Sequence, residues 1–270
     1  MTSPASRPLR TLGKSDLKLT SIGFGAWAIG GSWGDYDNDG NLDLIVTNYS
    51  NGKNNLYHNS GPPNYNLVSV DTGIVSNEPA NSVGSCWGDF NNDGNLDLFV
   101  SVIQGPNLLF TNRGNGTFSR VPTGPLVTGS YVSAGCAWGD YDNDGFPDMF
   151  VSVNGNPPNN DLLYHNNGNG TFTQISTGSI VNSGGKGNAC AWGDYDNDGY
   201  LDLYVINSDQ NNFLFHNNGD GTFTRITSGP LVTQQVGTGI MTADTGQDTT
   251  ANSDALIEKI LAENDGTAGK

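Results

Sequence analysis

One stretch of the sequence decides the fold: Trp192-Gly193-Asp194-Tyr195-Asp196-Asn197-Asp198-Gly199-Tyr200-Leu201-Asp202. Close copies of it begin at Trp33, Trp87 and Trp138, and the first acids of successive copies are 54, 51 and 54 residues apart. A fixed period of this length is the signature of a repeat protein, whose units bury their apolar faces against one another. The chain is therefore predicted to consist of repeats a little over 50 residues long.

Each copy has the pattern of a loop that wraps a hard cation. In the first copy Asp35, Asp37 and Asp39 alternate with other residues, and Gly40, which can adopt positive φ, comes before Asp43. Ca²⁺ takes about six to eight oxygen ligands, which side chains at loop positions 1, 3, 5 and 9 and the backbone carbonyl at position 7 can supply. The expected calcium ligands are Asp35, Asp37, Asp39, Asn41 and Asp43; Asp89, Asn91, Asp93, Asn95 and Asp97; Asp140, Asp142, Asp144, Phe146 and Asp148; and Asp194, Asp196, Asp198, Tyr200 and Asp202.

Besides a calcium-binding loop between two strands, the loops could be EF-hands or solvated acidic turns. An EF-hand needs Glu at position 12 and flanking helices, whereas position 12 is valine in every copy and Leu42-Asp43-Leu44-Ile45-Val46 reads as a strand. A solvated acidic turn would explain one loop, but four in register disfavour it. The second loop has Asn91 in place of an aspartate and is predicted to be the weakest site, because it has one charge fewer.

The composition limits the classes of partner. The 270 residues include 27 acidic and 11 basic side chains, giving a formal net charge of −16 at pH 7, which repels nucleic acid. The loops contain 15 of these acids, so four bound Ca²⁺ ions would halve the net charge. No run approaches the ~18 apolar residues of a membrane span, and no signal peptide is visible in this chain.

The sequence between the loops predicts short antiparallel strands. Asn-Gly pairs such as Asn169-Gly170 lie between apolar runs, which is a strong hairpin signal because both residues tolerate positive φ. Four such strands form one blade of a β-propeller, in which the blades repeat around a central axis. The predicted fold is therefore an all-β propeller of four or five four-stranded blades. In the unit spanning 124–178, the expected strands are Val132–Trp138, Met149–Val153, Leu162–His165 and Thr171–Ile175.

The loop pattern, together with Gly-Thr-Phe-Thr in the fourth strand, resembles the FG-GAP or VCBS repeats of integrin-α-like propellers. The resemblance covers about residues 26–239, and we assign residues 26–245 to the calcium-binding repeats. It implies about four Ca²⁺ ions, an extracellular or cell-surface location, and a role in adhesion or in binding a protein or glycan. Self-association through the end blades is also expected if the ring does not close within one chain.

The two ends of the chain have a different character. Arg7–Leu19 and Ser21–Gly31, within residues 1–32, resemble the start of aldo/keto reductases, which leaves an oxidoreductase as an alternative function. No catalytic motif of that family follows, so we expect no enzyme, and residues 1–25 are treated as a separate N-terminal segment. The structural alternative, which we favour, is that the segment before Trp33 supplies the opening strand of the first repeat. The tail, 246–270, contains a predicted short helix over 254–264, capped by Ser253.

Aromatic residues and histidines also recur once per repeat. The tryptophan before each loop is predicted to pack between blades, and Tyr36, Phe90, Tyr141 and Tyr195, inside the loops, are candidates for an exposed contact surface. The three histidines, His58, His165 and His216, share one position, which Thr111 occupies in the second repeat. Because radial symmetry would keep them apart, we expect them to be side chains of the outer hairpins and not a shared zinc site.

Overall fold

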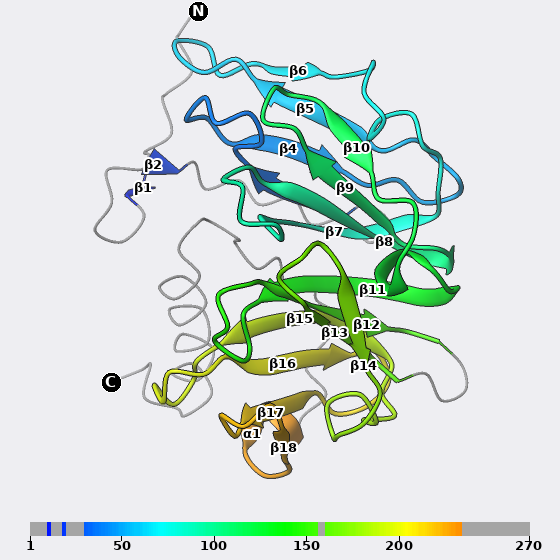
Figure 1. Ribbon diagram of the computed structural model, residues 1–270, viewed down its shortest axis with the longest axis vertical. Helices are drawn as coiled ribbons and strands as arrows, with labels where there is room; N and C mark the ends of the chain where they lie inside the picture. The colour runs from blue at the N-terminus through cyan, green and yellow to red at the C-terminus, as the bar shows by residue number, and fades with distance from the viewer. Residues whose placement is uncertain (1–9, 12–17, 20–29, 156–159, 234–270) are drawn as a thin grey trace, which may run out of the picture.

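The computed structural model describes residues 10–11, 18–19, 30–155 and 160–233. Within them, four groups of four antiparallel strands follow one another along the chain, one for each repeat (Figure 1). The strands are β3 (Gly31–Gly34), β4 (Asp43–Val46), β5 (Asn55–Asn59) and β6 (Leu67–Ser69); β7 (Ser82–Gly88), β8 (Asp97–Gly105), β9 (Leu108–Asn112) and β10 (Phe118–Arg120); β11 (Tyr131–Gly139), β12 (Asp148–Val153), β13 (Leu162–Asn166) and β14 (Phe172–Ile175); and β15 (Gly187–Gly193), β16 (Asp202–Asn207), β17 (Phe213–Asn217) and β18 (Phe223–Ile226).

The predicted strands of the third repeat are confirmed to within one residue at each end. Gly139 pairs with Asp148, so the acidic loop connects β11 to β12 as expected. The predicted hairpin between β13 and β14 also forms, but Gly168, at φ 69°, and Gly170, at φ 81°, take the positive φ values and Asn169 does not. The Asn169 side chain instead accepts a hydrogen bond from the Thr171 amide. In the first repeat the outer turn differs, as predicted, because it contains Pro62-Pro63.

The core lies between successive repeats. Alternate side chains of a strand point to opposite faces of its sheet, and in β12 Met149 and Val151 join the cluster shared with the second repeat while Phe150 joins the cluster shared with the fourth. Both faces of β12 are therefore buried, which explains why its residues do not alternate between polar and apolar. In β16, Tyr204 and Ile206 are buried together with Leu231 and Val232 of the last described segment.

The linkers between repeats add apolar side chains to these cores. The 3-10 helix η1 (Pro125–Val127) places Leu126 and Val127 against the cluster that contains Trp138. Ile180 and Val181 fill the corresponding place between the third and fourth repeats. The single short α-helix of the described residues, α1 (Pro230–Thr233), packs Leu231 and Val232 on the fourth sheet.

Neighbouring repeats interlock through a tryptophan and a glycine. A Cβ atom on Gly139 would lie 2.6 Å from Cδ1 of Trp192, so only glycine allows the indole to pack this closely. In the first three repeats, the loop aromatic stacks on the tryptophan of the next repeat, with ring planes 11–14° apart. The prediction that Tyr36, Phe90 and Tyr141 form an exposed contact surface is therefore wrong, since all three are buried, and Tyr195 is half-buried. The stacked pairs are Tyr36–Trp87, Phe90–Trp138 and Tyr141–Trp192.

Other predictions concern the ends of the chain. β1 (Arg10–Thr11) and β2 (Lys18–Leu19) form a short antiparallel pair. The predicted helix over 254–264 lies outside the described residues, and closure of the repeats into a ring stays a prediction. None of the helices in the described part of the chain has the length and hydrophobicity that crossing a bilayer requires.

Candidate metal centre

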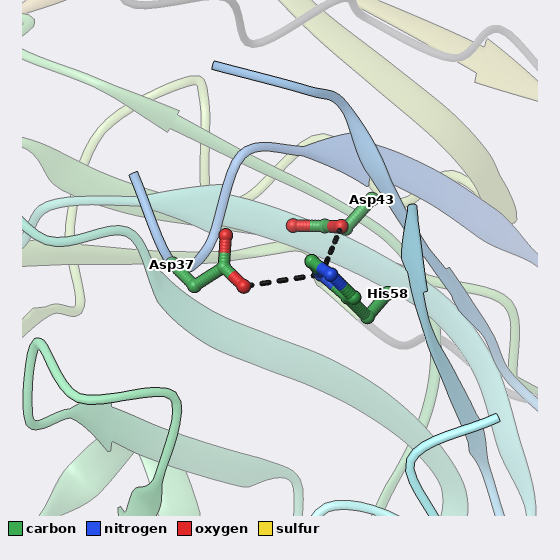
Figure 2. Close-up of side chains that lie close together, drawn as sticks. All are labelled: Asp37, Asp43 and His58. Carbon is green, nitrogen blue, oxygen red and sulfur yellow. Dashed lines mark ion pairs between the residues drawn. The ribbon is translucent and has the colours of Figure 1, made fainter. Parts of the chain in front are cut away.

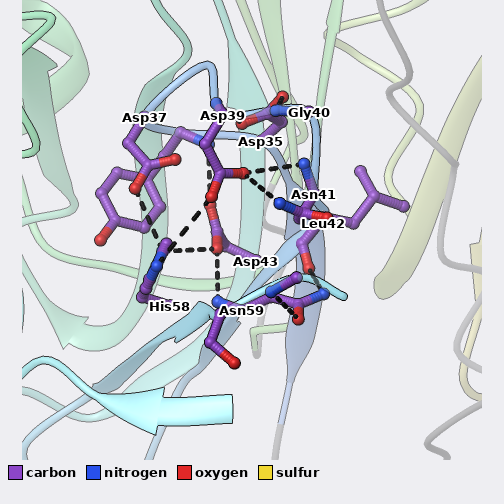
Figure 3. A network of polar contacts seen from close by, with 12 residues as sticks. Asp35, Asp37, Asp39, Gly40, Asn41, Leu42, Asp43, His58 and Asn59 are labelled. Carbon is purple, nitrogen blue, oxygen red and sulfur yellow. Dashed lines mark hydrogen bonds and ion pairs between the residues drawn. The ribbon is translucent and has the colours of Figure 1, made fainter. Parts of the chain in front are cut away.

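Each acidic loop curls around its first carboxylate. Asp35 accepts hydrogen bonds from the backbone amides of Asp39, at 3.0 Å, and Gly40, at 2.9 Å (Figure 3). Gly40 has φ 86°, a conformation that residues with a Cβ rarely adopt. Asp39 in turn accepts from the amide of Asn41 at 2.8 Å. The same contacts around the first carboxylate recur at Asp89, Asp140 and Asp194.

The last acid of each loop is buried at the start of the second strand. Asp43 has no exposed surface and accepts hydrogen bonds from the amide of Tyr36, at 3.2 Å, and the amide of Asn59, at 2.8 Å. These bonds fix the carboxylate between the loop and β5. Asp97, Asp148 and Asp202 are held in the same way by the amides of Asn112, Asn166 and Asn217.

Burial and neighbouring carboxylates make these loops unfavourable places for negative charge. Burial, together with the charges of nearby loop acids, raises the pKa of Asp43 to about 6 and that of Asp148 to about 8, although backbone hydrogen bonds to both carboxylates act in the opposite direction. Burial likewise raises the pKa of Asp97 to about 8 and that of Asp202 to about 6. A bound divalent cation would favour the ionised carboxylates and so offset this cost.

The oxygen atoms of the loops fit a cation. Oxygens of Asp35, Asp37 and Asp39 lie within 4.8 Å of one another, as do those of the equivalent acids in the third repeat. Several carboxylate oxygens are buried without a hydrogen-bond partner within the described residues, namely Oδ1 of Asp37, Oδ1 of Asp142 and Oδ2 of Asp97. The donor set consists of hard oxygens, which suits Ca²⁺.

The position-7 residues were predicted to offer only a backbone carbonyl, and their side chains pack elsewhere. The Phe146 ring lies over Gly168 of the outer hairpin, and the Tyr200 ring lies over Gly219. Asn41 and Asn95 occupy the same place against Gly61 and Gly114. Their side chains therefore tie each loop to the outer turn of its own repeat.

The sequence interpretation missed the histidines. His58 Nδ1 lies 3.1 Å from Asp37 Oδ2 and 3.4 Å from Asp43 Oδ1 (Figure 2). The three histidines are spread among the repeats as expected, but each one faces the acidic loop of its own repeat. A signal was present in the sequence, because the one repeat without the histidine, with Thr111, is also the one with Asn91 in place of the third-position acid. The remaining pairs are His165 with Asp142 and Asp148, and His216 with Asp196 and Asp202, at 3.1–3.3 Å.

Neighbouring loops are bonded to each other. The side chain of Asn92 donates to the carbonyl of Gly145, in the next loop, at 2.8 Å, and Asn143 donates to Gly199 at 2.9 Å. With the contact of Asn38 to the Gly94 carbonyl at 3.4 Å, the four described loops form a hydrogen-bonded row across the repeats.

Known proteins share this sequence pattern. A family model described as FG-GAP-like repeat matches residues 35–100, 89–151, 150–205 and 194–251. Cartilage acidic protein 1 of Mus musculus is 26% identical over 171 residues, covering 60% of this chain and 26% of that protein. Cartilage acidic protein 1 of Xenopus tropicalis is 29% identical over 192 residues, covering 64% and 28% respectively. The chain thus spans about a quarter of the length of these relatives.

Two solved structures match part of the chain. One is an Agrocybe aegerita lectin that recognises non-reducing terminal N-acetylglucosamine, with a TM-score of 0.47 and 19% identity, covering 73% of this chain and 51% of that one. Another is BBS1N in complex with ARL6DN, with a TM-score of 0.45 and 14% identity, covering 76% and 58%. None of these matches supports the predicted resemblance of residues 1–32 to aldo/keto reductases.

The matched segments begin at or near the first acid of a loop or within the strand that follows it, and together they cover more than half of the chain. They include all four acidic loops and the strands that bury the last acid of each loop. The chain therefore belongs to the FG-GAP-like repeat family.

Proposed function

We propose that this chain binds about four Ca²⁺ ions, one in each acidic loop, and that the ions stabilise a non-catalytic scaffold for recognition or adhesion. The observation that carries the proposal is the repetition of one site: an exposed turn of acids ends in a carboxylate buried at the start of a strand, at Asp43, Asp97, Asp148 and Asp202. Burial disfavours the ionised form of these four carboxylates, so a bound cation would stabilise them more than it would stabilise exposed acids.

The energetic effect of four ions is large compared with the stability of a domain. Calcium-binding modules of extracellular proteins bind at about 10⁻⁴–10⁻³ M. At ten times Kd, one site adds about 1.4 kcal/mol, because the ion binds only the folded form. Four independent sites would add about 5–6 kcal/mol, which is comparable to the net stability of a typical domain. Calcium would therefore supply a large part of the stability of the repeats.

The proposed location is extracellular or at the cell surface. If the loops bind calcium as weakly as the modules of extracellular proteins, they fill only where free calcium is in the millimolar range. A non-catalytic role is supported by the uniformity of the loops, since a catalytic metal site combines an open coordination position with its own acid or base. Nucleic acid is not a proposed partner, because the chain has a net charge of −16.

A contact surface for a protein or glycan is proposed on the first repeat. The exposed large hydrophobic side chains of the described residues all lie between Trp33 and Ile74. They include Tyr65, 62% exposed, and Leu67 and Val68 on the edge strand β6. Large apolar side chains exposed within a single repeat support an interaction site there.

Self-association is a second candidate function, and the same surface favours it. An exposed edge strand offers unpaired backbone groups to another chain, and β6 lies at the end of the first sheet. The test is the mass in solution of the wild type and of a variant with Leu67→Ser and Val68→Ser. A larger wild-type mass that the variant loses supports self-association, whereas a monomer in both cases rejects it.

Calcium titration by calorimetry tests the proposed function. We expect about four ions per chain, with the weakest binding at the second loop. Replacing the buried acid of one loop, as in Asp148→Asn, should remove one ion and leave the others. A chain that binds no calcium at millimolar concentration would reject the proposal.

A further inference from the structure

We propose that the three loops faced by a histidine also bind a first-row transition metal ion, such as Co²⁺ or Zn²⁺, whereas the second loop binds only a hard cation. The ligands would be the Nδ1 atom of the histidine and two carboxylates of the same loop, for example His58 with Asp37 and Asp43. The inference rests on the proposed role of the loops as cation sites, and it assigns two ion classes to three of the four.

The geometry repeats three times. The histidine Nδ1 lies 3.1–3.2 Å from the third-position acid and 3.2–3.4 Å from the buried last acid in the first, third and fourth repeats. Two ligands of one ion with bonds of about 2.0–2.2 Å are roughly 3.0–3.5 Å apart, for tetrahedral or octahedral angles. All three donor atoms of each group lie within 4.8 Å of one another.

The state of the imidazole nitrogen is the second observation. Nδ1 of His58, His165 and His216 is buried and has no hydrogen-bond partner in the described part of the chain, although two carboxylate oxygens lie close to it. Neither oxygen is therefore placed where an N–H group would donate to it. A buried nitrogen that faces two oxygens without bonding to either is suited to a shared ion, because a buried polar atom without a partner is costly.

The donor chemistry separates the two classes of ion. Ca²⁺ takes oxygen ligands, whereas imidazole nitrogen suits zinc, cobalt, nickel and copper. The buried acid is common to both sets, so calcium and a transition metal would compete for one loop. About a quarter to a third of each histidine side chain remains exposed, which gives an ion access from solvent.

The second repeat provides a control within the chain. It has Asn91 and Thr111 in place of the acid and the histidine. Its last acid, Asp97, is as buried as the others and accepts a hydrogen bond from the Asn112 amide at 2.7 Å. The loop thus keeps the buried, hydrogen-bonded carboxylate and lacks the nitrogen donor. The second repeat is therefore the natural counterpart of a variant in which the acid and the histidine of another repeat are replaced.

The test uses Co²⁺ as the probe, because its visible absorption reports nitrogen coordination. Calorimetry and absorption are measured on the calcium-free wild type, on a variant with His58→Thr, His165→Thr and His216→Thr, and on a variant with Asn91→Asp and Thr111→His. We expect three Co²⁺ ions per wild-type chain and four in the Asn91→Asp, Thr111→His variant. The triple threonine variant should bind Co²⁺ on the order of tenfold or more weakly at each site.

Calcium titrations of the same proteins verify folding and separate the two proposals. About four calcium ions in both the wild type and the threonine variant, with Co²⁺ binding weakened only in the latter, support the inference. Equal Co²⁺ binding and spectra in the two proteins overturn it, because the histidines then act only as ion-pair partners of the acids. Co²⁺ binding without calcium binding would overturn the proposed calcium function and leave the histidine sites standing.

Discussion

The side-chain amide of Asn166 donates a hydrogen bond at 2.8 Å to the backbone carbonyl of Phe90, which lies 76 positions earlier, in the loop of the preceding repeat. The Asn166 backbone amide at the same time donates to Asp148, the buried acid of its own loop, at 2.7 Å. One residue therefore connects two adjacent metal loops. Asn112 and Asn217 make the same pair of contacts in their repeats.

Replacing this asparagine should weaken the contact between repeats. Asn166→Ala leaves the buried carbonyl of Phe90 without its donor, and an unsatisfied buried group costs about 1–3 kcal/mol. We expect the free energy of unfolding, measured in urea, to fall by that amount. Asn59→Ala is the matched control, because the side-chain amide of Asn59 donates to Leu42 of its own repeat. An equal decrease in the free energy of unfolding in both variants would show that the bond between repeats contributes no more than the bond within a repeat.

The packing of tryptophan on glycine predicts a second effect. In Gly139→Ala the new Cβ would lie 2.6 Å from Trp192, so the indole must move out of its stack with Tyr141. Overpacking of this kind costs about 1–3 kcal/mol. Gly73→Ala is the control, because a Cβ there meets no atom within 4 Å. Thermal unfolding should show a lower Tm for Gly139→Ala alone, and an unchanged Tm would refute the steric argument.

A buried acid outside the metal loops predicts a pH dependence. Asp161 is 1% exposed and accepts hydrogen bonds from the Val153 amide and the Ser183 hydroxyl, while burial raises its pKa to about 7. The folded state therefore binds this proton more tightly than the unfolded state, so the contribution to stability is complete below about pH 4 and is lost as the pH rises to 7.

The other repeats have an asparagine where the third has Asp161. Asn107 accepts from the Val102 amide and Asn212 from the Asn207 amide, in the same role. Asp161→Asn should therefore stabilise the protein at pH 8 and change little at pH 4. Urea unfolding of both proteins across this range measures the difference. A difference in the free energy of unfolding between the two proteins that is the same at pH 4 and at pH 8 would contradict the raised pKa of Asp161.

The loop carboxylates predict how pH changes the effect of calcium. Burial raises the pKa of Asp97 and that of Asp148 to about 8, so without metal these groups also stabilise the fold at low pH and lose that contribution as the pH rises to 8. Calcium needs the ionised form, so its stabilising effect should increase over the same interval. We expect Tm in chelator to fall between pH 5 and pH 8, and the gain from calcium to grow. An increase in Tm on adding calcium that is the same at pH 5 and at pH 8 would argue against Asp97 and Asp148 as calcium ligands.

Local signals in the sequence were sufficient for the loops and strands. The alternation of Asp35, Asp37 and Asp39 before a glycine, and the apolar run after Asp43, each depend on neighbouring residues, and both predictions hold in the structure. The hairpin that contains Asn169-Gly170 was predictable for the same reason, although Gly168 and not Asn169 takes the positive φ beside Gly170.

The remaining features depend on contacts between distant residues. The loop position of Tyr36 suggested exposure, but the next repeat covers it with Trp87, which no local pattern reveals. His58 approaches Asp43 only because β4 and β5 pair in one register. The sequence spacing between strands does not fix which side chain of the third strand lies over the loop, so the histidines were not predicted as part of the site.

The central claim is that calcium in the acidic loops holds the repeats together, and thermal unfolding with calcium or with chelator tests it most directly. At pH 7.5 we predict a Tm about 10–20 °C higher in calcium at ten times Kd than in chelator, because four ions would add about 5–6 kcal/mol. The gain should shrink when Asp43, Asp97, Asp148 and Asp202 are replaced one after another by asparagine. A Tm that is the same in calcium and in chelator would contradict the account.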